Sequence, residues 1–165
     1  MKQNILTFGG IIVFVIVGFF LLNGGDGNSS TKTVSASTLE SLESYYDFGT
    51  ISMGNGDVAK LFEVKNTGTE PVTIEKVYTS CMCTTAKLTN ASGKTYGPYG
   101  MPGHVSYDSS KIEIRGGETA LVEAIFDPAA HGPSGIGLNQ RVIYLETNSA
   151  QTPKVELKFA ATVTN

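Results

Sequence analysis

The sequence contains few of the residues and motifs that are typical of catalytic, metal-binding or nucleic-acid-binding proteins. Its 165 residues include no tryptophan, two cysteines and two histidines. Acidic residues slightly outnumber basic ones, 15 to 12, which gives a formal net charge of −3, and lysine and arginine do not cluster anywhere. This balance argues against nucleic acid as a partner and against tight binding to an anionic lipid surface.

Signatures of catalysis are also missing. The sequence has no serine nucleophile elbow, no paired carboxylates at a catalytic spacing and no phosphate-binding loop. Thiol–disulfide oxidoreductases use Cys-x-x-Cys at a helix N-terminus, and thiol proteases carry local motifs around their cysteine; neither pattern occurs here. We therefore predict that the protein is not an enzyme.

The longest apolar run is residues 5–22, which contain no charge. As a helix this segment would be about 27 Å long, enough to cross a hydrocarbon core of about 30 Å. Lys2 and the amino terminus are the only positive charges before it, so we expect residues 1–4 to stay cytoplasmic. Residues 5–22 are then an uncleaved single-pass anchor, with a cleaved signal peptide as the alternative. The rest of the chain is predicted to lie outside the cytoplasm, in the periplasm or at the cell surface.

Composition changes sharply after the apolar run. Residues 23–44 are rich in Gly, Ser, Thr and Asn, which is typical of a flexible linker. No cysteine follows the apolar run directly, so a lipoprotein anchor is excluded. We expect residues 23–44 to hold a folded domain, residues 45–165, away from the membrane.

Apolar and polar residues alternate repeatedly in residues 45–165, most regularly from Val155 to Val163. Strands with one buried face are typical of antiparallel sheets. About seven such strands, separated by Gly, Pro and Asn turns, predict an all-β fold, an immunoglobulin-like antiparallel β-sandwich preceded by one transmembrane helix. Antibody domains themselves carry a Cys…Trp…Cys signature that is absent here.

The two cysteines, Cys81 and Cys83, are separated by one residue. In an extended strand they would lie side by side on one face. The sequence leaves three alternatives open for this pair: the two cysteines form a disulfide, bind a metal ion, or fill space as inert thiols. A disulfide suits an oxidising compartment, but it would close a very small loop and would need a turn rather than a strand.

Adjacent thiolates suit copper(I) or zinc(II) as a cofactor. His104 or His131 would complete such a metal site. Met82 and Met101 add thioethers, which favour copper(I) over zinc(II). The spacing Cys-x-Cys is shorter than that of most closed zinc sites.

Residues 85–110 form a long segment rich in Gly, Tyr, Ser and Pro, and long loops are often functional. A binding loop there would present Tyr96, Tyr99, Met101 and Tyr107. A second glycine-rich loop, residues 131–137, is its expected neighbour. An unidentified envelope protein is the expected partner of these loops.

Three segments occur together in a recognisable order: YDFGTI at 46–51, FEVKNTG at 62–68 and SCMCT at 80–84. They resemble the bacterial DUF1573 family, whose members show FDFG-x-I, F-x-x-x-N-x-G and S-C-G-C-T. The resemblance implies export and an immunoglobulin-like sandwich of the ASH, MSP and PapD type, and it implies no particular activity. Met82 replaces the glycine between the family's cysteines, and methionine should resist the tight backbone that glycine allows.

Two functions remain open from the sequence. The first is a membrane-anchored extracytoplasmic immunoglobulin-like module that binds a protein partner or is structural. The alternative is a copper-binding or zinc-binding domain that uses Cys81 and Cys83.

Overall fold

The computed structural model describes residues 33–104 and 110–165. The fold below is that of the unit formed by residues 33–165. The predicted cytoplasmic residues 1–4 and the predicted anchor 5–22 lie outside the described residues. Within the described residues, no helix has the length and apolar character needed to cross a membrane.

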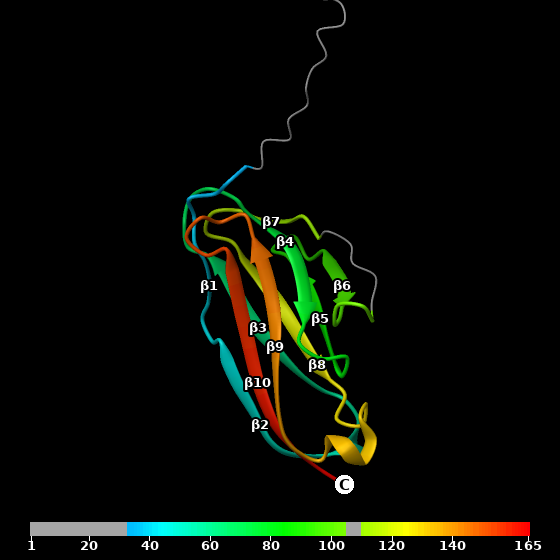
Figure 1. The fold of residues 1–165 in the computed structure, drawn as a ribbon. Coiled ribbons are helices and arrows are strands. Elements are labelled where there is room, and N and C mark those ends of the chain that lie inside the picture. Colours follow the sequence, from blue (N-terminus) through cyan, green and yellow to red (C-terminus); the bar gives the residue numbers. More distant parts are fainter. Residues whose placement is uncertain (1–32, 105–109) are drawn as a thin grey trace, which may run out of the picture. The chain divides into compact units, whose positions relative to one another are not determined.

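The described chain is all-β and forms two five-stranded sheets (Figure 1). In the first sheet the strand order is β1 (Leu39–Ser41), β3 (Val58–Asn66), β8 (Thr119–Phe126), β5 (Thr84–Thr89) and β6 (Thr95–Tyr99). In the second it is β2 (Tyr45–Ser52), β10 (Lys154–Thr164), β9 (Gly137–Thr147), β4 (Val72–Thr79) and β7 (Ile112–Ile114). The helical elements in the described residues are two short 3-10 turns, η1 (Met53–Asn55) and η2 (Gly132–Gly135).

The all-β prediction is confirmed, but two of its details are wrong. The described residues form ten strands rather than about seven, because the short strands β1, β6 and β7 carry too few residues to show a clear alternation. One pair, β2 and β10, is parallel, whereas the other pairs are antiparallel. Between β1, which pairs with β3, and β2, which pairs with β10, the chain passes from the first sheet to the second.

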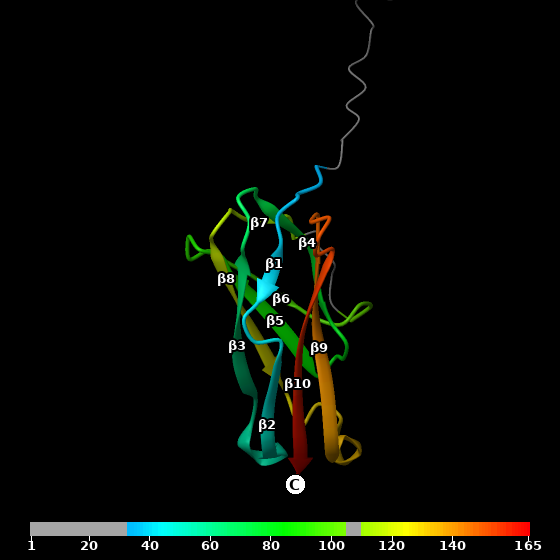
Figure 2. The same cartoon turned by 90° about the vertical axis from the view of Figure 1, so that its left-hand side faces the viewer.

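Alternation of buried and exposed residues places one core between the two sheets (Figure 2). Phe126 of β8 and Phe159 of β10 meet across it, with ring centroids 5.4 Å apart. Burial of such side chains is the main favourable term in folding, worth roughly 1.5–3 kcal/mol for each large apolar residue. The period of two seen in the sequence is therefore the pattern of a sandwich with one buried face on each sheet.

Residues 33–44 belong to the folded unit, so their assignment to a flexible linker is wrong. Leu39 of β1 is fully buried in the core, and Ser35 and Ser37 are buried as well. The Ser149 hydroxyl donates a hydrogen bond to the Ser37 carbonyl, and Ser35 forms a parallel β-bridge with Ser149. Serines that suggest a linker by composition here satisfy buried backbone groups instead.

The Asn66–Gly68 turn explains one of the three sequence motifs. The buried Asn66 side chain donates hydrogen bonds to the carbonyls of Glu70 and Ile114, at 2.8 and 2.9 Å, and accepts one from the Gly68 amide. A Cβ atom at Gly68 would lie under 3.0 Å from atoms of Ser37. The turn therefore needs an amide side chain and, two residues later, the absence of a side chain.

Candidate metal site

Two connections between the sheets meet at one end of the sandwich. Residues 80–83 connect β4 in the second sheet to β5 in the first, and residues 127–136 connect β8 in the first to β9 in the second. Since β5 pairs with β8, and β4 with β9, the two connections must lie side by side. The Asp127 amide donates a hydrogen bond of 2.9 Å to the Cys83 carbonyl and joins them directly.

The first connection is a tight turn that brings the two thiols together. The Thr84 amide donates to the Cys81 carbonyl at 3.1 Å, and the Thr79 hydroxyl bonds the carbonyls of Cys81 and Thr84. The Sγ atoms of Cys81 and Cys83 are 2.6 Å apart and are not joined in this structure, and a disulfide between the two cysteines stays a prediction. The expected extended geometry of this pair is therefore wrong.

Met82 fits the turn despite replacing a glycine. Among the described residues, the only non-glycine residue with a positive φ angle is Lys111. The turn thus uses backbone angles that any L-residue adopts, and the expectation that methionine would resist it is wrong. The Met82 side chain is half exposed.

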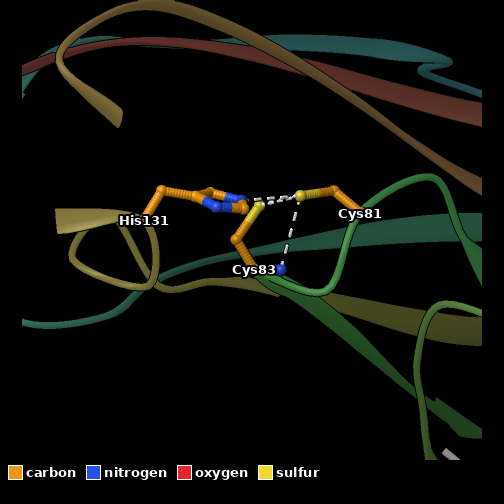
Figure 3. Close-up of side chains that lie close together, drawn as sticks. All are labelled: Cys81, Cys83 and His131. Atoms are coloured by element: carbon orange, nitrogen blue, oxygen red, sulfur yellow. Dashed lines mark hydrogen bonds between the residues drawn. The ribbon is translucent and has the colours of Figure 1, made fainter. Parts of the chain in front are cut away.

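The second connection supplies an imidazole. The Nε2 atom of His131 lies 3.2 Å from Cys81 Sγ, and the side chains of His131, Cys81 and Cys83 point toward one another (Figure 3). The ligand atoms of these three residues all lie within 4.8 Å of one another. Cys83 is buried, Cys81 is half-buried and His131 is exposed, so the cluster opens to solvent on the imidazole side.

The two thiols differ in acidity. Burial raises the pKa of Cys81, but the hydrogen bonds from Cys83 and His131, together with the charge of Arg141, outweigh burial and lower this pKa to about 7. Burial and the hydrogen bond to Cys81 raise the pKa of Cys83, against the opposing effect of Arg141. Near neutral pH the pair therefore carries its negative charge mainly on Cys81.

Sequence reasoning missed two residues of this site, Arg141 and Asn139. The Arg141 Nε donates a hydrogen bond of 3.0 Å to Cys83 Sγ, and its Nη2 donates to Asn139 Oδ1 at 2.5 Å. Both residues lie at inward-facing positions of β9, in register with the buried Ile143 and Leu145. Polar residues at two successive inward positions of a strand were the available signal.

Other predicted site residues do not join the cluster. His104 is exposed and is not one of the three grouped ligands. Tyr96 and Tyr99 belong to strand β6 and pack partly against the core, so the segment predicted as a long loop begins with the β5–β6 hairpin. Met101 follows this hairpin and is half-buried, and Tyr107 lies outside the described residues.

The donor set suits a soft or borderline metal ion. Thiolate sulfur and neutral imidazole nitrogen are the ligands that copper(I) and zinc(II) prefer in proteins. Cys81, Cys83 and His131 would supply three ligands, so a zinc(II) ion held by them would keep one position for water or another ligand, unlike a closed structural site. Of the two histidines expected as candidates, the fold brings only His131 to the cysteines.

Fold and site together define a β-sandwich domain with a dithiol–imidazole cluster between two inter-sheet connections. Residues 39–96 match the model of DUF1573, a family described as proteins of unknown function. This match confirms the resemblance to DUF1573 seen in the sequence, and it includes both cysteines. No curated protein matches the chain.

The fold recurs in a solved structure of a protein of unknown function from Porphyromonas gingivalis W83. The two chains are 20% identical with a TM-score of 0.57, over 82% of this chain and 51% of the other. This chain therefore corresponds to about half the length of that relative. More distant are the Vibrio cholerae VesB protease, with 12% identity and a TM-score of 0.46 over 79% of this chain and 32% of the protease, and the periplasmic chaperone SfaE. SfaE is 9% identical to this chain, with a TM-score of 0.41 over 78% of this chain and 59% of the SfaE chain.

Proposed function

We propose that this domain binds a soft or borderline metal ion, copper(I) or zinc(II), through Cys81, Cys83 and His131. The observation that carries the proposal is the grouping of two sulfur atoms and one imidazole nitrogen within 4.8 Å of one another. These atoms come from two separate connections, and Cys81 and His131 are fifty residues apart in the sequence. Local sequence alone does not bring a histidine to a cysteine pair at that distance.

The acidity of the thiols supports binding at neutral pH. Metal ions bind thiolates, so a thiol must lose its proton first. The pKa of Cys81 is lowered to about 7, which makes one thiolate available without a large cost. The pKa of Cys83 is raised, so binding by the second sulfur would release a proton to solvent.

The accessibility of the cluster supports metal transfer rather than a closed structural role. His131 is exposed and Cys81 is half-buried, so a donor atom from another protein has access to the remaining coordination position. We infer that the partner is an envelope protein that gives or receives the ion by exchange of ligands. The domain then binds and carries the metal and catalyses no reaction.

We infer that this carrier is an immunoglobulin-like domain held outside the cytoplasm. The two face-to-face sheets support the immunoglobulin-like assignment. The uncharged segment 5–22 supports a single-pass anchor, and the Gly- and Ser-rich residues 23–32 support a tether to the membrane. Thiolate ligands in that location would need a metal, or a reductant, to stay unoxidised.

The proposal is tested on the full chain, purified without oxygen or chelator in a mild detergent. Bound metal is measured by mass spectrometry and free thiols are counted before and after metal removal. We expect close to one copper or zinc ion per chain, with thiols that react fully only after the ion is removed. The double variant Cys81→Ser, Cys83→Ser should lose the metal, and His104→Ala, which changes the histidine outside the cluster, should keep it. A fully reduced wild-type chain that binds neither ion in titration would contradict the proposal.

A further inference from the structure

Arg141 is held against the cysteine pair by a set of contacts that fix its guanidinium group. Its Nε donates to Cys83 Sγ at 3.0 Å, its Nη2 to Asn139 Oδ1 at 2.5 Å and its Nη1 to the Gln140 carbonyl at 2.9 Å. The group also lies over the ring of Phe126, with 5.9 Å from Cζ to the ring centroid. These contacts hold the positive charge beside the sulfur.

Asn139 fixes the arginine and the histidine-bearing connection at once. Its side chain is buried, and its Nδ2 donates to the carbonyls of Gly135 and Gly137, at 2.8 and 3.0 Å. Its Oδ1 accepts the bond from Arg141. Since residues 132–135 directly follow His131, the same amide orders the arginine and the connection that carries the imidazole.

The charges around the cluster add up to a specific total. Arginine stays protonated in proteins, so Arg141 contributes +1, and its field acts on both thiols. Two thiolates contribute −2, the neutral imidazole contributes nothing, and no carboxylate belongs to the grouped ligands. The site with its ligands deprotonated therefore carries −1.

We propose that Arg141 makes this site selective for the monovalent ion copper(I) over the divalent ion zinc(II), an inference that rests on the metal-binding function proposed above. A monovalent ion brings the site, Arg141 included, to zero net charge, whereas a divalent ion brings the total to +1 and leaves the charge of the half-buried guanidinium uncompensated. An uncompensated charge that is partly removed from water is costly. Because Arg141 Nε is 3.0 Å from Cys83 Sγ, any ion bound by that sulfur also lies close to the guanidinium.

The test compares the affinities for the two ions in the full chain, reduced and kept without oxygen. Copper(I) and zinc(II) are each titrated in competition with a chromogenic chelator, and the ratio of the two dissociation constants is the readout. Arg141→Gln removes the charge and should move the ratio toward zinc by about tenfold or more, as expected for one unit charge at close range. Arg141→Lys keeps the charge and should largely keep the ratio.

Two further variants separate charge from folding. Arg115→Gln makes the same exchange at an exposed arginine that pairs with Glu113, and it should leave the ratio unchanged. Asn139→Asp sets a carboxylate against Arg141 and should also move the ratio toward zinc. Because it loses the Nδ2 hydrogen bonds to Gly135 and Gly137, circular dichroism first verifies that the variant folds, and it then serves if Arg141→Gln does not fold. A ratio that stays within twofold of wild type in a folded Arg141→Gln or Asn139→Asp chain would overturn the selectivity proposal. A wild-type chain that binds neither ion would instead overturn metal binding itself.

Discussion

The Nε2 atom of His131 lies 3.2 Å from the Sγ atom of Cys81, although fifty residues separate them. The connection that carries Cys81 joins β4 to β5, and the connection that carries His131 joins β8 to β9. Because β4 pairs with β9 and β5 pairs with β8, the two connections lie side by side. A metal bound by the cysteines would therefore have an imidazole within reach.

His131→Ala is expected to weaken metal binding while the fold persists, because the side chain is exposed and lies outside the core. Loss of a group that merely supports a ligand typically costs 10–100-fold in metal affinity, and loss of the ligand should cost at least about as much. Competition titration with a chromogenic chelator measures the change. His104→Ala is the matched control; an equal loss in both variants would show that His131 is not a ligand.

Cys81 is expected to react with iodoacetamide faster than Cys83 in the reduced, metal-free chain. The pKa of Cys81 is lowered to about 7, whereas that of the buried Cys83 is raised. The thiolate is the nucleophile, so alkylation of Cys81 should rise with pH and reach half of its maximum rate near pH 7. Peptide mass spectrometry after timed labelling from pH 5 to 9 follows each site. Equal rates at the two cysteines would contradict the assignment of the thiolate to Cys81.

Leu39→Ala is expected to reduce the free energy of unfolding by about 2–5 kcal/mol, because it opens a cavity in the core. Leu39 is 0% exposed, while Leu42, three residues later, is 75% exposed. Leu42→Ala should therefore change stability by no more than about 0.5 kcal/mol. Urea denaturation followed by circular dichroism compares the two. If both variants are as stable as wild type, residues 33–44 are not part of the folded unit.

Gly68→Ala is expected to destabilise the fold by about 1–3 kcal/mol, since its Cβ would overlap atoms of Ser37 and force the backbone apart. Gly54→Ala provides the control, because a Cβ there would lie 3.6 Å from Ser52 Oγ, an ordinary contact. Thermal denaturation of the two variants under one set of conditions gives the comparison. Similar melting temperatures would mean that Ser37 moves aside without cost.

Much of the fold was predictable because alternation is a local property. Strands β8 and β10 repeat apolar residues at every second position, and β3 and β9 do so over part of their length. This period identifies a half-buried strand whatever its neighbours are. The short strands, the parallel pairing of β2 with β10 and the burial of Leu39 depend on contacts with distant segments. None of these three features can be predicted from a window of ten residues.

The candidate site was predictable only in part, for the same reason. Cys81 and Cys83 stand out in the sequence because they are its only cysteines. The choice between His104 and His131 required the strand order, which places one connection beside the other. Arg141 and Asn139 belong to no motif. Their role depends on their inward positions in β9, and these positions can be assigned only when the neighbouring strands are known.

The position of the cluster also couples it to the cohesion of the whole sandwich. Cys81 and Cys83 lie on one connection between the sheets and His131 lies on the other. An ion bound by all three would therefore cross-link the two connections at that end of the sandwich. A ligand that binds only the native state raises the unfolding free energy by RT ln(1 + [L]/Kd), about 2.7 kcal/mol at a hundredfold excess over Kd. The melting temperature of the domain should therefore report how much of the protein carries metal, and a chelator should lower it.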